Sequence, residues 1–196
     1  MKHFIFPAII ALILGLVLAS CTKSSYMEPV VTPEMDYTDL ANVEVSQGSV
    51  KSVDIDGNGS SDFVFNVILV GDPILQRDRL QFYANSKVKT NLMVDELEQT
   101  PLLEKNALIS LNPAGHQWFE ISAIVLAEKI STVAGAIYWD GLWKNANHHY
   151  LGVQVEKEGK IFQGWIELSF NQAAQKLVLH RAAISREPGK TIRAGK

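Results

Sequence analysis

Length, charge and cysteine content already limit what this protein is. The chain has 196 residues, a formal net charge of −3 and a single cysteine, Cys21. Acidic and basic residues are well mixed, without the basic stripe that nucleic-acid binding requires, so we expect no nucleic-acid partner. One cysteine allows no internal disulfide and no multi-cysteine metal site, so stability must come from a hydrophobic core and any bound ion. The length favours one globular domain.

The first twenty residues predict a secretory signal. Lys2 and His3 form a short polar start, and an almost unbroken apolar run extends from Phe4 to Ala19. The run is short for a membrane span, which needs about 20 residues, and small residues end it, as in a signal peptide. We therefore expect residues 1–20 to be removed and to take no part in the fold.

The segment that follows resembles the lipobox of bacterial lipoproteins. It reads LASC over residues 18–21, and in that class the cysteine is acylated and becomes the new N-terminus. The resemblance implies lipid on Cys21, and several acyl chains together anchor a protein stably. Thr22 follows the cysteine, whereas an aspartate there is the familiar inner-membrane retention signal, so the resemblance implies the outer membrane. The alternative is an ordinary secretory signal with an accidental cysteine.

Residues 21–42 are predicted to tether the anchor to the folded domain. They include Pro29 and Pro33 and show no sustained periodicity, which is typical of an extended linker. The alternative is that Val30-Val31 or residues 37–40 dock as an edge strand. The domain itself is expected over residues 43–196.

Period-two alternation of apolar residues dominates the rest of the chain and predicts an all-β fold. The pattern appears in residues 45–56, 62–70, 79–88, 117–126, 149–155, 160–170 and 176–184. Seven or eight such strands predict a mainly antiparallel β-sandwich. Residues 93–105 and 124–130, rich in Glu and Leu, are expected to add one or two short helices.

The last third of the chain resembles the closing hairpins of a broad group of secreted bacterial β proteins. The motifs are YLGV from Tyr150, GWIELS from Gly164 and PGKTIRAG from Pro188. The resemblance implies a fold and secretion, and implies no activity.

The stretch DIDGNGSSD, residues 54–62, carries the clearest functional signal. A calcium ion takes about six to eight oxygen ligands, and an EF-hand loop supplies them from alternate positions around a glycine that makes the bend. The residues at the matching positions are Asp54, Asp56, Asn58, Ser60 through its backbone carbonyl, and Asp62, with Gly59 at the bend. Phe65 occupies the place of the bidentate glutamate, which rules out a true EF-hand.

The order of these residues instead resembles the calcium turns of FG-GAP repeats and related extracellular β domains, where the loop joins two strands. The resemblance implies calcium as the cofactor. The alternative is a plain hairpin, because Asn58-Gly59 is by itself a strong turn signal. A hairpin leaves Asp54, Asp56 and Asp62 unexplained, since three converging carboxylates repel one another without a cation.

Signatures of catalysis are absent from the sequence, which holds no nucleophile elbow, phosphate-binding loop, dinucleotide fingerprint or zinc-protease motif. We therefore expect a structural or interaction protein, not an enzyme. The adjacent His148 and His149 would face opposite ways on a strand and so make a poor metal pair.

Two tryptophans suggest an alternative function. Trp139 and Trp143 lie beside Asp and Asn residues in what is expected to be a loop, and exposed rings with polar neighbours can stack on sugars. The chain would then be a calcium-assisted carbohydrate-binding module. The competing interpretation places both rings in the core of the sandwich.

Overall fold

The structure, a computed structural model, describes residues 32–196, and these are almost entirely strands and turns. The strands are β1 (Met35–Val45), β2 (Val50–Val53), β3 (Phe63–Asp72), β4 (Arg77–Ser86), β5 (Thr90–Val94), β6 (Leu108–Ile109), β7 (Gln117–Glu120), β8 (Ala123–Thr132), β9 (Ile137–Asp140), β10 (His149–Lys157), β11 (Lys160–Asn171), β12 (Lys176–Ser185) and β13 (Ile192–Arg193). A 3₁₀ turn, η1 (Leu142–Asn145), follows β9. Within this range no helix has the length and apolar character needed to cross a membrane.

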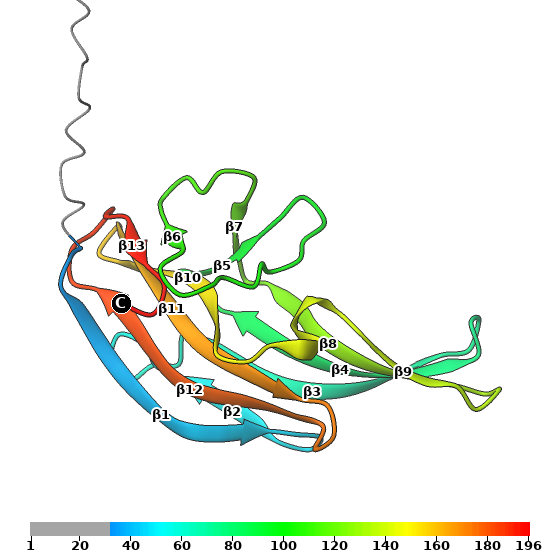
Figure 1. The fold of residues 1–196 in the computed structure, drawn as a ribbon. Coiled ribbons are helices and arrows are strands. Elements are labelled where there is room, and N and C mark those ends of the chain that lie inside the picture. The colour runs from blue at the N-terminus through cyan, green and yellow to red at the C-terminus, as the bar shows by residue number, and fades with distance from the viewer. Residues whose placement is uncertain (1–31) are drawn as a thin grey trace, which may run out of the picture. The chain divides into compact units, whose positions relative to one another are not determined.

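Two antiparallel sheets pack face to face (Figure 1). The six-stranded sheet has the order β1-β12-β11-β10-β5-β7, and the five-stranded sheet has the order β2-β3-β4-β8-β9. Side chains from both inner faces form the main core, including the fully buried Phe63 and Phe65 of β3 and Ile166 and Leu168 of β11. The alternation of these residues along their strands follows from the pleat. The predicted all-β, mainly antiparallel sandwich is therefore confirmed.

The outer face of the six-stranded sheet is covered as well. There β13 pairs with β6 in a small two-stranded sheet, and a second apolar cluster joins Tyr150, Trp165, Ala183, Ile192 and Ala194. Tyr150 packs edge-to-face on Trp165, with ring centroids 5.2 Å apart. Four of these five residues come from the YLGV, GWIELS and PGKTIRAG motifs, so the three motifs form one packing unit.

The two predicted helices are wrong. Residues 124–130 lie within β8, and residues 93–105 contain the end of β5 and an irregular loop that makes one bridge, Leu103 to Tyr150. A short apolar run suits either a helix or a buried strand. Ala127 lies opposite Phe82 and Val125 opposite Tyr83, so Leu126 is an extra residue on β8, and Leu126 and Ala127 are both fully buried. This interruption of the alternation hides the strand in the sequence.

The chain enters the sandwich earlier than the expected boundary at residue 43. β1 pairs with β12 from Met35 opposite Ser185 to Val45 opposite Leu177, so residues 35–42 are not part of a tether, and the edge-strand alternative describes residues 37–40. The rest of the expected tether up to residue 31, with Val30-Val31, and the expected signal and lipobox lie outside the described residues. Most of β1 is exposed or half-buried, so no apolar period marks it.

A glycine in the middle of β11 tests this packing. A Cβ on Gly164 would lie 2.6 Å from the carbonyl oxygen of Ala183 and 3.3 Å from Cδ1 of Ile55. We expect Gly164→Ala to lower the free energy of unfolding by about 1–3 kcal/mol, as overpacking does. Gly71→Ala is the control, because its Cβ would meet only Asp78 Oδ1 at 3.6 Å. Chemical denaturation measures both, and equal midpoints for the two variants would contradict the packing described.

Candidate metal centre

The loop of residues 54–62 joins β2 to β3 at one end of the five-stranded sheet. The hairpin closes where Val53 pairs with Phe63 and the Asp62 N–H donates to the Val53 carbonyl at 2.9 Å. Gly57 and Gly59 have φ values of 70° and 85°, which glycine adopts without steric cost.

The plain two-residue hairpin is not what the loop forms. A type I′ turn at Asn58-Gly59 requires positive φ at both residues. Gly59 has it, but Asn58 is not among the residues with positive φ. The loop is wider than the turn signal alone predicts, and its extra residues carry the aspartates.

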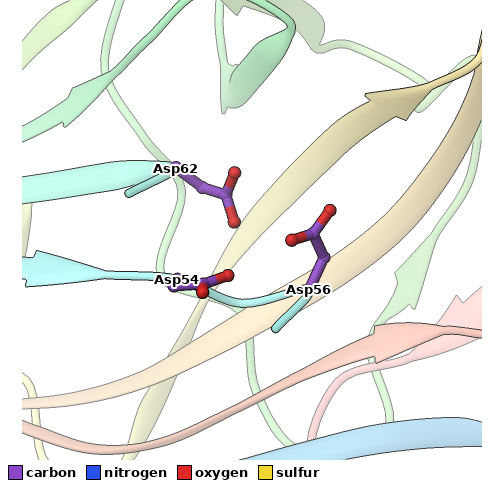
Figure 2. A group of neighbouring side chains, drawn as sticks. All are labelled: Asp54, Asp56 and Asp62. Carbon is purple, nitrogen blue, oxygen red and sulfur yellow. The ribbon is translucent and has the colours of Figure 1, made fainter. Parts of the chain in front are cut away.

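Three carboxylates converge inside this loop. One oxygen each from Asp54, Asp56 and Asp62 lies within 4.8 Å of the others, and the three carboxylates point toward one another (Figure 2). Oxygens bound to one calcium ion at about 2.3–2.6 Å are at most about 5 Å apart. A single cation could therefore contact all three carboxylates.

Hydrogen bonds from the loop backbone hold two of these carboxylates. Asp54 Oδ1 accepts the Gly57 N–H at 2.8 Å and Asp54 Oδ2 accepts the Gly59 N–H at 2.7 Å. Asp56 Oδ1 accepts the Asn58 N–H at 3.1 Å. Charge-assisted bonds of this kind are stronger than neutral ones, so the aspartates themselves shape the loop around the group.

Asp62 is the one aspartate of the three that is buried as a whole residue. The residue is 5% exposed, its Oδ2 accepts the Ile55 N–H at 2.9 Å, and its carbonyl accepts the Thr90 hydroxyl at 3.0 Å. Burial, with repulsion from Asp56 and Asp54, raises the pKa of the Asp62 carboxyl against the lowering effect of the Ile55 N–H. Ionised Asp62 is therefore destabilised in the fold, and a nearby cation would offset that cost.

Lys157, at the end of β10, gives partial compensation. Its Nζ lies 3.5 Å from Oδ2 of Asp56, whose side chain is 1% exposed. Two unit charges at the separation of these carboxylates repel by roughly 3 kcal/mol at an effective dielectric of about 20. One lysine against three carboxylates leaves an excess of negative charge. No local sequence signal reveals Lys157, because it is about a hundred residues away in the chain.

The remaining predicted ligands lie on the exposed side of the loop. Asn58 Oδ1 accepts the Ser60 N–H at 2.7 Å, and both residues are exposed. Together with Asp62 they line an open cleft of about 530 Å³ that also contains Lys87 and Lys89. The structure thus brings the three predicted aspartates together and leaves Asn58 and Ser60 at the solvent edge of the group. Phe65 is fully buried in the core.

The two tryptophans do not form an exposed pair. Trp143 lies in η1 with 0% exposure, and its Nε1–H donates to the Thr100 carbonyl and hydroxyl, both at 3.0 Å. Trp139 is half-buried on β9 and packs edge-to-face on Phe170 at 5.1 Å. The prediction of Trp143 as a stacking platform is wrong, and the core interpretation holds for this residue because its only polar atom has partners inside the fold.

His148 and His149 each contact a carboxylate outside this loop. His148 Nδ1 lies 2.8 Å from Glu167 Oε1, and His149 Nε2 lies 3.0 Å from Glu104 Oε1. The rings of His148 and His180 stack at 4.1 Å, a contact that the sequence did not predict because His148, just before β10, is 32 residues away from His180 on β12. Burial and the neighbouring His148 lower the pKa of His180.

Comparison with known proteins gives no further guide. No family model, no curated protein and no solved structure matches the chain. No function can therefore be assigned to this chain from a similar protein.

Replacing Asp62 by asparagine tests the effect of its charge, because the two side chains have nearly the same shape. Asp62→Asn keeps an oxygen that can accept the Ile55 N–H and removes the charge. Because the pKa of Asp62 is raised in the fold, its destabilising effect is absent below about pH 3.8 and fully present above the raised pKa. In chelator, we expect Asp62→Asn to gain stability relative to the wild type as pH rises through that window.

Urea unfolding from pH 3 to pH 7 measures this gain. Asp95→Asn is the control, because the Asp95 carboxylate also accepts backbone N–H groups, from Leu97 and Gln99, and lies outside the group. A stability difference between wild type and Asp62→Asn that stays constant with pH would contradict the electrostatic description of the site.

Proposed function

We propose that this chain is a membrane-anchored, calcium-binding β-sandwich lipoprotein with a structural or interaction role and no catalytic activity. The convergence of Asp54, Asp56 and Asp62 within 4.8 Å supports the ion site most directly. It is the arrangement that the calcium-turn pattern predicted, in a loop between two strands.

Calcium suits the donor set better than other common ions. The available donors are oxygens, and zinc favours nitrogen and sulfur ligands. Magnesium requires octahedral geometry at about 2.0–2.1 Å and loses its water reluctantly. With no glutamate at the position of Phe65, water would complete the coordination shell. We therefore propose a Kd of roughly 10⁻⁴ to 10⁻³ M, in the range of extracellular modules.

The anchor rests on the lipobox-like residues 18–21 and on Cys21 being the only cysteine. Thr22 in the following position favours the outer membrane. Such a protein would hold its sandwich beside a membrane, in a compartment where the calcium concentration is comparable to the proposed Kd. The carbohydrate-binding alternative loses its pair of exposed rings, since Trp143 is buried.

Calcium should stabilise the folded domain. At a calcium concentration of ten times Kd, the free energy of unfolding should rise by about 1.4 kcal/mol. For a domain of this size that corresponds to an increase in Tm of roughly 3–6 °C. Thermal unfolding of the full chain in calcium, magnesium or chelator measures the effect, and magnesium should give much less.

Two aspartate variants show whether the shift comes from this loop. Asp56→Ala should abolish the calcium shift. Asp95→Ala should keep it, although it also removes a turn-capping carboxylate. A wild-type Tm that is the same in millimolar calcium as in chelator would refute the ion site.

Lipidation can be tested separately. Labelled palmitate should enter the full chain in a bacterial host, and Cys21→Ala should abolish the labelling because no other thiol exists. Label that persists in the alanine variant would show that Cys21 is not the acylated residue.

A further inference from the structure

Two neighbouring hairpins continue beyond the core of the sandwich. Residues 73–76 join β3 to β4, and residues 133–136 join β8 to β9. No residue in the ranges 68–79 and 131–140 is buried. Figure 1 shows both hairpin ends projecting past the rest of the domain on the same side.

The tips of these hairpins carry large apolar side chains. Ile74 is 90% exposed, Val133 is 80% exposed and Leu75 is 59% exposed. The turns read PILQ and VAGA and contain no charged residue. Surface turns normally favour polar Asn, Asp and Ser beside Gly and Pro, so turn formation alone does not explain these aliphatic residues.

The two tips form one continuous feature. Pairing of β4 with β8 runs to Arg77 opposite Thr132, and beyond it the Val133 N–H donates to the Gln76 carbonyl at 3.0 Å. Ile74, Leu75 and Val133 are therefore carried side by side on adjacent turns.

Several polar groups at the tips already have partners within the tips. The Leu75 N–H donates to Asp72 Oδ1 at 3.0 Å, and the Ala136 N–H donates to the Thr132 hydroxyl at 3.0 Å. Asp72 and Arg77 form an ion pair at 3.1 Å. Burying a polar group that already has a hydrogen-bond partner costs less than burying an unpaired one, so these bonds lower the cost of removing the tips from water.

The size and shape of the tips favour a lipid surface over a protein partner. A stable protein interface uses about 20–30 residues on each side, whereas the exposed aliphatic side chains here sit on the narrow ends of two turns. Tyr138, which is 46% exposed, lies just behind the tips, a residue type enriched at membrane interfaces. Asp78 pairs with Ser131, one register position nearer the tips than Tyr138, and Lys129 pairs with Trp139, one position farther back. These charges would limit the depth of entry.

From this arrangement we infer that the tips of the β3–β4 and β8–β9 hairpins insert into the headgroup region of a lipid bilayer. The insertion requires neither lipid on Cys21 nor calcium in the loop, so it goes beyond the proposed function and can fail or succeed independently of it.

A fluorescent probe at single positions tests the insertion. The full chain carrying Cys21→Ser provides a background without thiols, into which Val133→Cys is introduced and labelled with the polarity-sensitive dye NBD. Val88→Cys is the matched control, because Val88 is an exposed valine (66%) in the turn after the opposite end of β4. The vesicles contain phosphatidylcholine and phosphatidylglycerol.

With vesicles, we expect the emission of the probe at position 133 to shift to shorter wavelength and to be quenched by nitroxide-labelled lipid. The probe at position 88 should show neither change, and Ile74→Asp with Leu75→Asp should remove both changes at position 133. Equal responses at positions 133 and 88 would overturn the inference. So would a blue shift at position 133 that grows with protein concentration in the absence of vesicles, since a second copy would then cover the tips.

Discussion

Both faces of β11 are covered by other parts of the chain, and the packing on each face determines where neighbouring segments lie. One side packs into the sandwich through Ile166 and Leu168, and the other lies under the small sheet through Trp165. Gly164 has no side chain and so leaves room on the inner face for Ile55. A Cβ added at Gly164 would lie 3.3 Å from Cδ1 of Ile55. Ile55 stands between Asp54 and Asp56, so the packing that buries Ile55 also fixes the part of the chain from which both aspartates enter the loop.

In the loop, hydrogen bonds between the aspartates and backbone N–H groups stabilise the fold, whereas repulsion among the carboxylates and the burial of Asp62 destabilise it. Asp54 and Asp56 gain hydrogen bonds from the loop N–H groups, while Asp62 loses hydration and faces two like charges. Because these bonds orient Asp54 and Asp56, a cation would meet positioned carboxylates, and little conformational entropy would be lost on binding. The number of oxygen ligands, and not the ordering of the loop, should then limit the affinity.

Sequence reasoning succeeded where signals are local and failed where they depend on distant pairing. The aspartate spacing predicted the convergence of Asp54, Asp56 and Asp62, because a short loop between paired strands confines its side chains. Sequence reasoning gave part of β1 only as an alternative to a tether, because the pairing partner β12 lies about 140 residues along the chain. Trp143 was misplaced because polar neighbours suggested a loop surface, whereas the Thr100 acceptors that bury its ring are distant in sequence.

The two features with functional implications lie at opposite ends of β3. Asp62 immediately precedes the strand, and Asp72, which caps the apolar turn, ends it. Ten strand residues span about 30 Å at roughly 3.3 Å per residue. Free-energy changes at sites more than about 7–10 Å apart usually add when no partner is shared. An ion in the loop should therefore stabilise the sandwich without altering the tips, and aspartates placed at the tips should leave the proposed ion site unchanged.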